Sequence, residues 1–224
     1  MKERGIIFNA EMVRAVLEGR KTQTRRMLSP RQLKMIDAAA SIGECYPLES
    51  GHQHENSQSY YRECCPFGAV GDRVWVRETW MPDAPRDGSW ADVSFYGCKG
   101  SPLSMIPERY RKPEHCIHRA SWEGSEMVGW TPSIHMPRWA SRITLEIIGV
   151  RVERLWDITE EDAKAEGCTF EALRLKPGTR EVEEMGHTAV SHFGGLWQSI
   201  YGDESWQANP WVWVIEFKRV EGDA

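Results

Sequence analysis

The chain has 224 residues, which is enough for one sizeable hydrophobic core or for a compact domain with long insertions. Hydrophobic residues make up 41% of it and charged residues 27%; no stretch approaches the length of an apolar membrane span, and the N-terminus lacks the apolar centre of a signal peptide. Composition therefore argues against a membrane protein and predicts a cytoplasmic one. The formal net charge of −5 disfavours tight binding to a long duplex, but the local basicity around Lys21 is sufficient for a small nucleoside or a short single strand.

The first predicted elements are a strand at residues 6–8 and a helix at residues 10–17. Asn9 precedes the helix as its N-cap, and apolar residues recur within it at helical spacing. Gly19 favours the end of the helix because glycine readily adopts the left-handed conformation found there. Residues 20–26 then contain one lysine, two threonines and three arginines, a composition suited to a polar pocket rather than to a core. We expect this segment to form a turn at the exit of the helix.

The rest of the chain predicts several strands, a few short helices and two long insertions. The insertions are expected at about residues 30–68 and 81–132, where turn-forming residues are frequent and apolar periodicity is weak. Within the first of them, Ser29-Pro30 can start a helix that runs through Met35, and residues 41–58 are expected to form a loop. Period-two patterns predict strands at residues 73–78, 142–147, 150–155 and 211–217. A capping-box-like start and apolar spacing predict short helices at residues 160–166 and 192–201. The pattern is typical of a mostly β protein with short helices (α+β), most simply a single barrel-like domain spanning residues 1–224.

Lys21 and Thr24 are the first candidate catalytic residues. They are three positions apart, so they would point to opposite faces of an extended strand but can converge in a turn. The neighbouring arginines repel a lysine ammonium and favour the neutral amine, which can take a proton from a threonine hydroxyl. The alternative is a solvated basic turn after a helix, and the residues taken alone favour that alternative.

Glu166 is the next candidate. It is expected at the end of a short helix, where unsatisfied carbonyl groups disfavour a negative charge and help a carboxylic acid to keep its proton. A carboxyl group of this kind suits general acid–base chemistry near neutral pH. The alternative is a surface glutamate like Glu160 and Glu161, and spacing does not decide between the two.

The motif Gly19-x-Lys21-x-x-Thr24-x-Arg26 resembles the signature of the ASCH domain, a small β-barrel of the PUA-like superfamily. Thr24 stands where the family often has glutamate, and this variant is similar to the small bacterial N4-acetylcytidine amidohydrolases of the superfamily. In those enzymes a lysine, a threonine and a glutamate are the proposed catalytic set, and Glu166 falls in the corresponding helix after a long strand. The chain also resembles phage and prophage ASCH-like proteins over nearly its whole length, through landmarks at residues 65–68, 71–78, 133–142 and 209–211. The two insertions are a departure from the compact amidohydrolases and would reshape the pocket.

The resemblance implies hydrolysis of the acyl group from the exocyclic amine of an N4-acylated cytosine nucleoside or a related modified base. Lys21 would deprotonate Thr24, Thr24 would attack the amide carbonyl, and Glu166 would pass the proton to the leaving amine and then activate water. Oxyanion, stacking and polar contacts to this substrate are expected from Arg26, Arg77, Trp75, Trp80, Arg138, Trp139 and Arg142. No cofactor is implied.

Two other functions and a zinc site are the alternatives. A non-catalytic module that binds RNA or a nucleotide is disfavoured by threonine at position 24, and a ribonuclease is disfavoured by the acidic net charge. Histidines and cysteines within residues 52–65 and 115–118 supply ligand types that zinc accepts, but neither group has paired CxxC spacing. No metal is therefore predicted, and the six cysteines are expected as free thiols.

Overall fold

The structure is a computed structural model that describes residues 2–83, 103–124, 129–168 and 188–220. Its strands are β1 (Glu3–Ile7), β2 (Gln23–Met27), β3 (Arg73–Arg77), β4 (Trp80–Pro82), β5 (Cys116–His118), β6 (Thr144–Arg154) and β7 (Trp211–Arg219). The α-helices of the described residues are α1 (Ala10–Leu17), α2 (Pro30–Ser41), α3 (Leu48–Gly51), α4 (Glu55–Glu63), α6 (Glu160–Ala165) and α7 (Ala189–Tyr201). The expected combination of strands with short helices is confirmed at this level.

The strands form a five-stranded mixed sheet in the order β1-β3-β6-β7-β2 and a two-stranded sheet of β4 and β5. The chain divides into two compact units. Unit 1 comprises residues 1–17, 72–146 and 219–224, and unit 2 comprises residues 18–71 and 147–218. Strand β6 contributes its first residues to unit 1 and the remainder to unit 2.

In unit 1, β1 runs parallel to β3 and β3 runs antiparallel to the start of β6. Helix α1 begins where the sequence predicts, because the side-chain oxygen of Asn9 accepts a hydrogen bond from the Met12 N–H at 2.8 Å. The predicted strand at residues 73–78 is β3, with Val74 and Val76 buried on one face. The predicted strand at residues 6–8 begins earlier, as β1.

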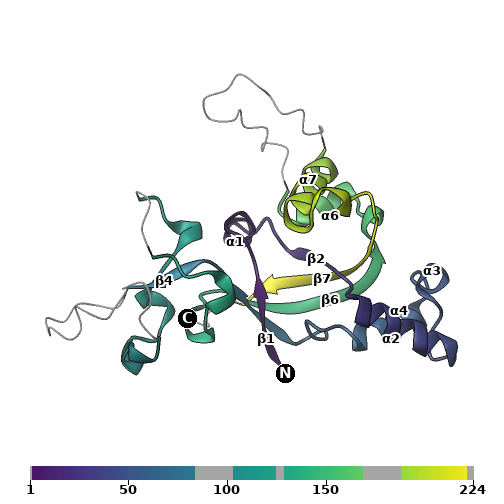
Figure 1. Ribbon diagram of the computed structural model, residues 1–224, viewed down its shortest axis with the longest axis horizontal. Coiled ribbons are helices and arrows are strands. Elements are labelled where there is room, and N and C mark those ends of the chain that lie inside the picture. The colour runs from purple at the N-terminus through teal and green to yellow at the C-terminus, as the bar shows by residue number, and fades with distance from the viewer. Residues whose placement is uncertain (1, 84–102, 125–128, 169–187, 221–224) are drawn as a thin grey trace, which may run out of the picture. The chain divides into compact units, whose positions relative to one another are not determined.

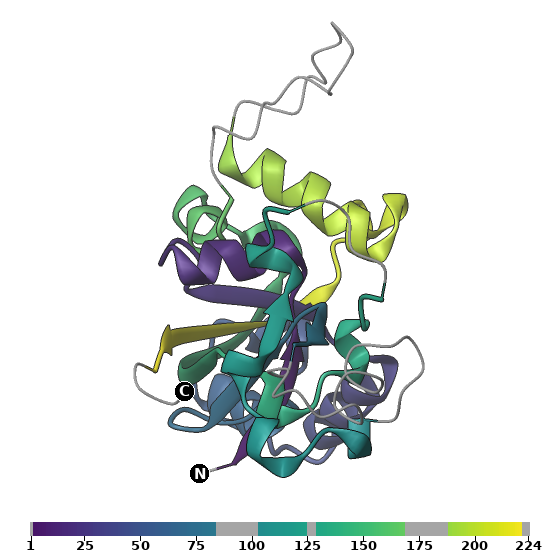
Figure 2. The same cartoon turned by 90° about the vertical axis from the view of Figure 1, so that its left-hand side faces the viewer.

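In unit 2, β2 pairs antiparallel with β7, and helices α6 and α7 lie together over one face of these strands (Figures 1 and 2). The core beneath the two helices consists of Leu155, Ile158, Ala163, Cys168, Ala189, Phe193, Trp197, Val212 and Val214. Helix α6 begins where the sequence predicts, at a capping box formed by Thr159 and Asp162. Helix α7 begins earlier than predicted, directly after Thr188. The Glu160 carboxylate also stabilises the N-terminus of α7, where it accepts hydrogen bonds from the Ala189 and Val190 N–H groups at 2.9 and 3.3 Å.

The turn expected at residues 20–26 is wrong, because strand β2 begins at Gln23. Its backbone pairs with β7 from Gln23 opposite Glu216 to Met27 opposite Val212, and the Thr22 carbonyl accepts a hydrogen bond from the Phe217 N–H at 2.8 Å. Pairing with a buried neighbour strand outweighs the weak strand preference of this polar sequence.

The segment at residues 30–68 contains three helices, of which the sequence predicts the first. Helix α2 begins with Pro30 as predicted, after the capping box of Ser29 and Gln32, and it extends beyond Met35 to Ser41. Helix α4 is fixed to β6 because the Gln58 amide bonds both the N–H and the carbonyl of Val152, at 3.0 and 2.7 Å, and Arg62 Nε donates to the Val150 carbonyl at 3.0 Å. Tertiary hydrogen bonds thus replace the apolar periodicity that the sequence lacks. Within the second expected insertion, residues 84–102 and 125–128 lie outside the described residues.

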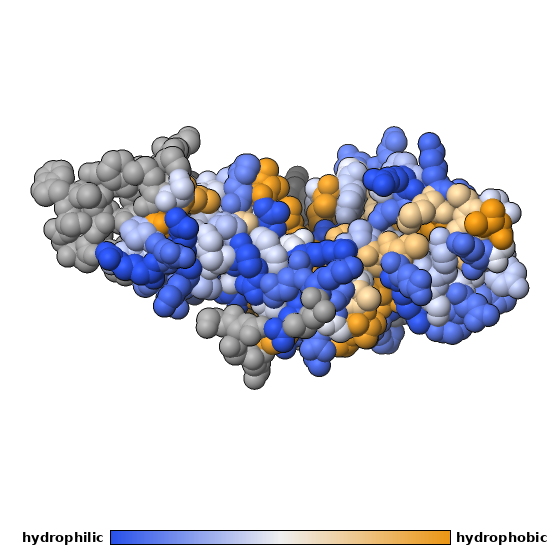
Figure 3. All heavy atoms as spheres, turned by 90° about the horizontal axis from the view of Figure 1, so that it is seen from below, coloured by the Kyte–Doolittle hydropathy of each residue, from blue (hydrophilic) through white to orange (hydrophobic). Residues whose placement is uncertain are grey.

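The face of the molecule in Figure 3 is mostly hydrophilic, with smaller hydrophobic areas between the polar residues. The more exposed large apolar side chains of the described residues include Ile42, Val70, Ile134, Ile148 and Trp156. No described helix combines the length and the apolar character that are needed to cross a membrane.

Candidate functional site

The site in unit 2 is built on one face of strand β2. Gln23 Nε2 donates to the backbone and side-chain oxygens of Asp162 at 2.9 and 3.0 Å, and Arg25 forms an ion pair with Asp162 at 3.1 Å. Because alternate residues of a strand share a face, these contacts place Gln23 and Arg25 on the side of α6. Lys21, two residues before Gln23, forms a β-bridge with Glu166 at the end of α6 and turns its side chain to the same helix.

Lys21 and Glu166, which are 145 residues apart, meet in the interior. Lys21 Nζ lies 2.6 Å from Glu166 Oε2 and donates a second hydrogen bond to the Glu166 backbone carbonyl at 3.0 Å. The Lys21 side chain has an exposed fraction of 0% and that of Glu166 2%. Burial lowers the pKa of the Lys21 ammonium; Glu166 and Cys168 oppose this change and Arg26 adds to it. The lysine is therefore closer to its neutral form than an exposed lysine would be.

Arg25 is a central residue of this site that the sequence reasoning missed. Its guanidinium is fully buried and contacts three carboxylates: Glu153 at 2.6 Å, Asp162 at 3.1 Å and Glu166 at 3.4 Å. The signal that was available is the alternation of Lys21, Gln23 and Arg25, which places three polar side chains on one face if the segment is a strand.

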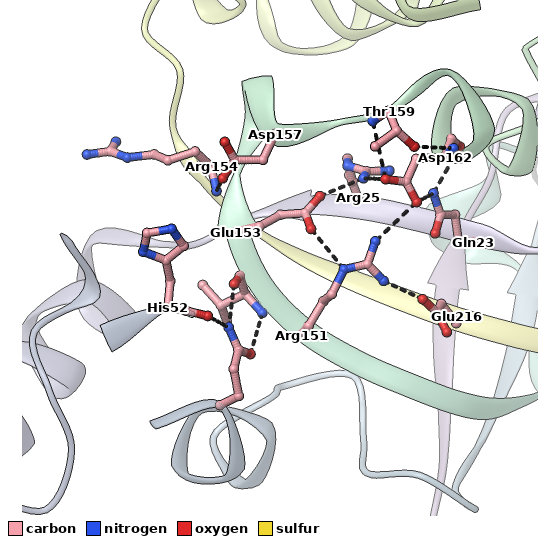
Figure 4. Close-up of polar contacts among 12 residues, drawn as sticks. Gln23, Arg25, His52, Arg151, Glu153, Arg154, Asp157, Thr159, Asp162 and Glu216 are labelled. Carbon is pink, nitrogen blue, oxygen red and sulfur yellow. Dashed lines mark hydrogen bonds and ion pairs between the residues drawn. The ribbon is translucent and has the colours of Figure 1, made fainter. Parts of the chain in front are cut away.

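Arg151 on β6 continues the chain of ion pairs, as Figure 4 shows. It contacts Glu153 at 2.8 Å and Asp162 at 3.1 Å, and it also pairs with Glu216 on β7. A Cβ at Gly149 would lie 2.6 Å from Glu216 Oε2, so glycine leaves room for that carboxylate. Burial alone would lower the pKa of Arg151, but the three carboxylates raise it above its ordinary value.

This network of ion pairs contains three cations and four carboxylates, so the formal charge of the network is −1 at neutral pH. Its members, from the buried end outward, are Lys21, Glu166, Arg25, Asp162, Glu153, Arg151 and Glu216. A cavity of about 400 Å³ borders its outer part, where Arg151 and Glu153 line the wall with His52 and Gln58.

Thr24 lies on β2 between Gln23 and Arg25 and is opposite Ile215 on β7. Strand alternation therefore directs its buried side chain to the face of β2 opposite to Gln23 and Arg25. Arg26 lies opposite Trp213 on β7 and, two residues after Thr24, shares the face of Thr24 rather than that of Arg25. The structure brings Lys21 and Glu166 together, and the catalytic role of Thr24 stays a prediction.

The other residues expected to bind a substrate belong to unit 1, where each has a structural contact. Arg142 pairs with both carboxylate oxygens of the buried Glu78, at 2.9 and 3.0 Å. Arg138 pairs with Glu3 at 3.0 Å. The remaining contacts involve aromatic rings: Trp80 is fully buried and lies edge-on to Trp139, and the Arg77 guanidinium lies 5.4 Å from the Trp75 ring.

Within the described residues, no group of three or more histidine, cysteine or acidic side chains is arranged to hold a metal ion. The histidines considered for zinc have other neighbours. His118 Nε2 lies 3.0 Å from the Ala140 carbonyl, and burial lowers the pKa of its ring. His52 Nδ1 lies 3.0 Å from the Leu48 carbonyl, and His54 packs against Tyr46.

Comparison with known proteins gives no match, whether to a family model, to a curated protein or to a solved structure. The resemblance to the ASCH domain therefore stays a prediction from the motif residues.

Proposed function

We propose that the chain is an ASCH-like domain of the PUA-like superfamily whose sheet forms the barrel of that fold. We further propose that it acts in the cytoplasm as an amidohydrolase, removing the acyl group from an N4-acylated cytosine nucleoside or a related modified base. The observation that supports this proposal is the contact of 2.6 Å between Lys21 Nζ and Glu166 Oε2 in a water-poor interior. A proton can pass between two groups at this distance, and general acid–base catalysis of amide hydrolysis uses such transfers.

Two routes use this pair, and they differ in the nucleophile. In the first, neutral Lys21 takes the Thr24 hydroxyl proton, Thr24 Oγ attacks the acyl carbon, and the C–N bond breaks as the proton passes through Glu166 to the amine. Glu166 then takes a proton from water, the resulting hydroxide cleaves the threonine ester, and Thr24 recovers its proton. In the second, Lys21 holds the Glu166 carboxylate in place, Glu166 takes a proton from water, the hydroxide attacks the acyl carbon directly, and Glu166 returns the proton to the leaving amine. The strand alternation of Thr24 favours the second route.

Incubation of the protein with N4-acetylcytidine and chromatography of released cytidine tests the proposal. We expect turnover by the wild type, and a decrease in kcat/KM of roughly 100-fold or more for Lys21→Ala and Glu166→Gln. Thr24→Ala separates the two routes: it should match Lys21→Ala in the threonine route and keep most of the turnover in the water route. Absence of turnover across acylated cytidines, or full activity of Lys21→Ala, would contradict the hydrolase proposal.

A non-catalytic module that binds a nucleotide or a short RNA is the second candidate. The observation that favours it is that Lys21 and Glu166 are almost completely buried and neutralise each other, as structural ion pairs do. This candidate predicts binding of a short single-stranded RNA, with a salt slope of roughly 0.7 per phosphate contact. Glu166→Gln should leave that binding unchanged, whereas it should abolish hydrolysis under the first proposal.

A further inference from the structure

Arg25 shares a face of β2 with Lys21 and contacts the same carboxylate. We infer that Arg25 is a positioning residue that holds Glu166 in place against Lys21 and helps to set the pH at which Lys21 loses its proton. The inference depends on the proposed function only in assigning that pair a role in catalysis. The contacts themselves are independent of the reaction.

Each oxygen of the Glu166 carboxylate has its own cation. Oε2 lies 2.6 Å from Lys21 Nζ, and Oε1 lies 3.4 Å from Arg25 Nη1. The other nitrogen of the Arg25 fork, Nη2, is held by Glu153 at 2.6 Å and by Asp162 at 3.1 Å. A planar guanidinium anchored at one nitrogen presents the other at a fixed position. Glu166 is therefore fixed between Lys21 and a cation that is itself fixed.

The fixed charge of Arg25 acts on the protonation of its neighbours. Its side chain is fully buried, so water screens its charge little. A positive charge held this close to the pair disfavours a second positive charge on Lys21. Removal of the Arg25 charge should therefore let Lys21 retain its proton to higher pH.

Other charged or titratable groups act on the same pair and must remain constant in the test. Arg26 and Cys168 influence Lys21 in addition to Glu166. Glu153 and Asp162 act through Arg25, and Arg151 contacts both of them but has no contact with Glu166 among its ion pairs. Arg151 is therefore the matched control. Its substitution removes one positive charge from the same network of ion pairs and leaves both oxygens of Glu166 with their cations.

The experiment follows the Lys21 side chain by NMR in the full chain labelled with ¹³C-lysine, with the resonance assigned by its loss in Lys21→Met. In Arg25→Gln, the titration midpoint of Lys21 should rise by roughly one pH unit. In Arg25→Lys, which keeps the charge, the midpoint should stay closer to that of the wild type. Arg151→Gln should shift it less than Arg25→Gln. An unchanged midpoint in Arg25→Gln, or an equal shift in Arg151→Gln, would overturn the inference.

A second variant keeps the inference testable if Arg25→Gln does not fold. Glu153→Gln removes the carboxylate closest to Arg25 and leaves more of the arginine charge uncompensated beside Glu166. The midpoint of Lys21 should then move down, and a midpoint that stays constant or rises would overturn the inference.

Activity measurements separate this inference from the proposed function. In an active enzyme, the acid limb of the kcat/KM profile should move in the same direction as the Lys21 midpoint in each variant. If no acylated cytidine is hydrolysed but the NMR midpoints shift as stated, the proposed function fails and the role of Arg25 stands. If turnover is present and the midpoints of Arg25→Gln and the wild type coincide, the function stands and the role of Arg25 fails.

Discussion

Each unit contains an arginine that pairs with a buried carboxylate, but the arginine and carboxylate are neutralised in different ways in the two units. In unit 1, Arg142 and Glu78 form a one-to-one pair in which one guanidinium takes both oxygens of one carboxylate. In unit 2, Arg25 divides its nitrogens among three carboxylates, and one of these is shared with Lys21. In a one-to-one pair each group depends on a single partner. In a shared network of ion pairs, a change at one member acts on several others.

The largest expected change in the free energy of unfolding comes from substitution within the ion-pair network of unit 2. Arg25→Met leaves three carboxylates in the interior without their common cation and should lower the free energy of unfolding by about 3–5 kcal/mol at pH 7. Urea denaturation measures this loss, which should become smaller at lower pH because the carboxylates can then be protonated. Arg151→Met is the control, since its side chain is 31% exposed, and it should cost less than half as much. Equal losses in the two variants would show that the buried part of the chain has no special weight.

The pair in unit 1 should give a smaller loss that can be repaired. Arg142→Met leaves the buried Glu78 without its arginine and should cost about 3 kcal/mol, because Arg142 itself is partly exposed. A second change, Glu78→Gln, should recover most of this loss in a double-mutant cycle measured by urea denaturation. By contrast, Glu166→Gln should recover only part of the loss in Arg25→Met, because Glu153 and Asp162 remain. Full recovery in that variant would contradict the difference between the two regions.

The pH dependence of Asp162 should be smaller again. Burial raises the pKa of Asp162, but the hydrogen bond from Gln23 and the charges of Arg25 and Arg151 lower it by more, so the net change is downward. A carboxyl group with a lowered folded-state pKa stabilises the fold above its unfolded-state pKa, and this contribution is lost as the pH falls through the folded-state value. Asp162→Asn should therefore cost about 1 kcal/mol at pH 7 and progressively less in acid. Thermal unfolding of both proteins between pH 7 and pH 2 tests this, and a gap that widens in acid would contradict it.

The exposed pair of unit 1 should give the smallest effect. Arg138 and Glu3 are each 38% exposed, so Arg138→Ala should change the free energy of unfolding by no more than about 1 kcal/mol. The difference should shrink further in high salt, which screens exposed charges. Thermal unfolding at low and high salt measures it, and a loss as large as that of Arg142→Met would show that exposure does not separate these two arginines.

The sequence predicted those parts of the fold that have local signals. Asn9 marks the start of α1, and Thr159 with Asp162 marks the start of α6, because each cap is a bond between residues three positions apart. Strand β2 has no such signal. Its residues are polar, and the bonds that make it a strand come from β7, almost 200 residues later in the sequence. Helix α4 is similar, since Gln58 and Arg62 obtain their partners on β6.

The candidate site was predictable in part for the same reason. The convergence of Lys21 with Glu166 was expected from the motif resemblance, while the residues alone favoured a solvated turn for Lys21 and spacing did not decide between a surface and a site position for Glu166. Arg25 was missed because its role depends on the alternation of β2, and the segment was interpreted as a turn. Thr24 shows the same dependence, since a strand directs its side chain away from the face that Gln23 and Arg25 share.

The two side chains that α4 extends to β6 have a consequence for association between copies of the chain. Gln58 occupies both backbone groups of Val152, and Arg62 occupies the carbonyl of Val150. These are the groups through which an incoming strand would add to the sheet and begin ordered aggregation. Helix α4, which is short and has little apolar character, thus covers part of the edge of β6. Loss of Gln58 would expose that edge to a neighbouring molecule.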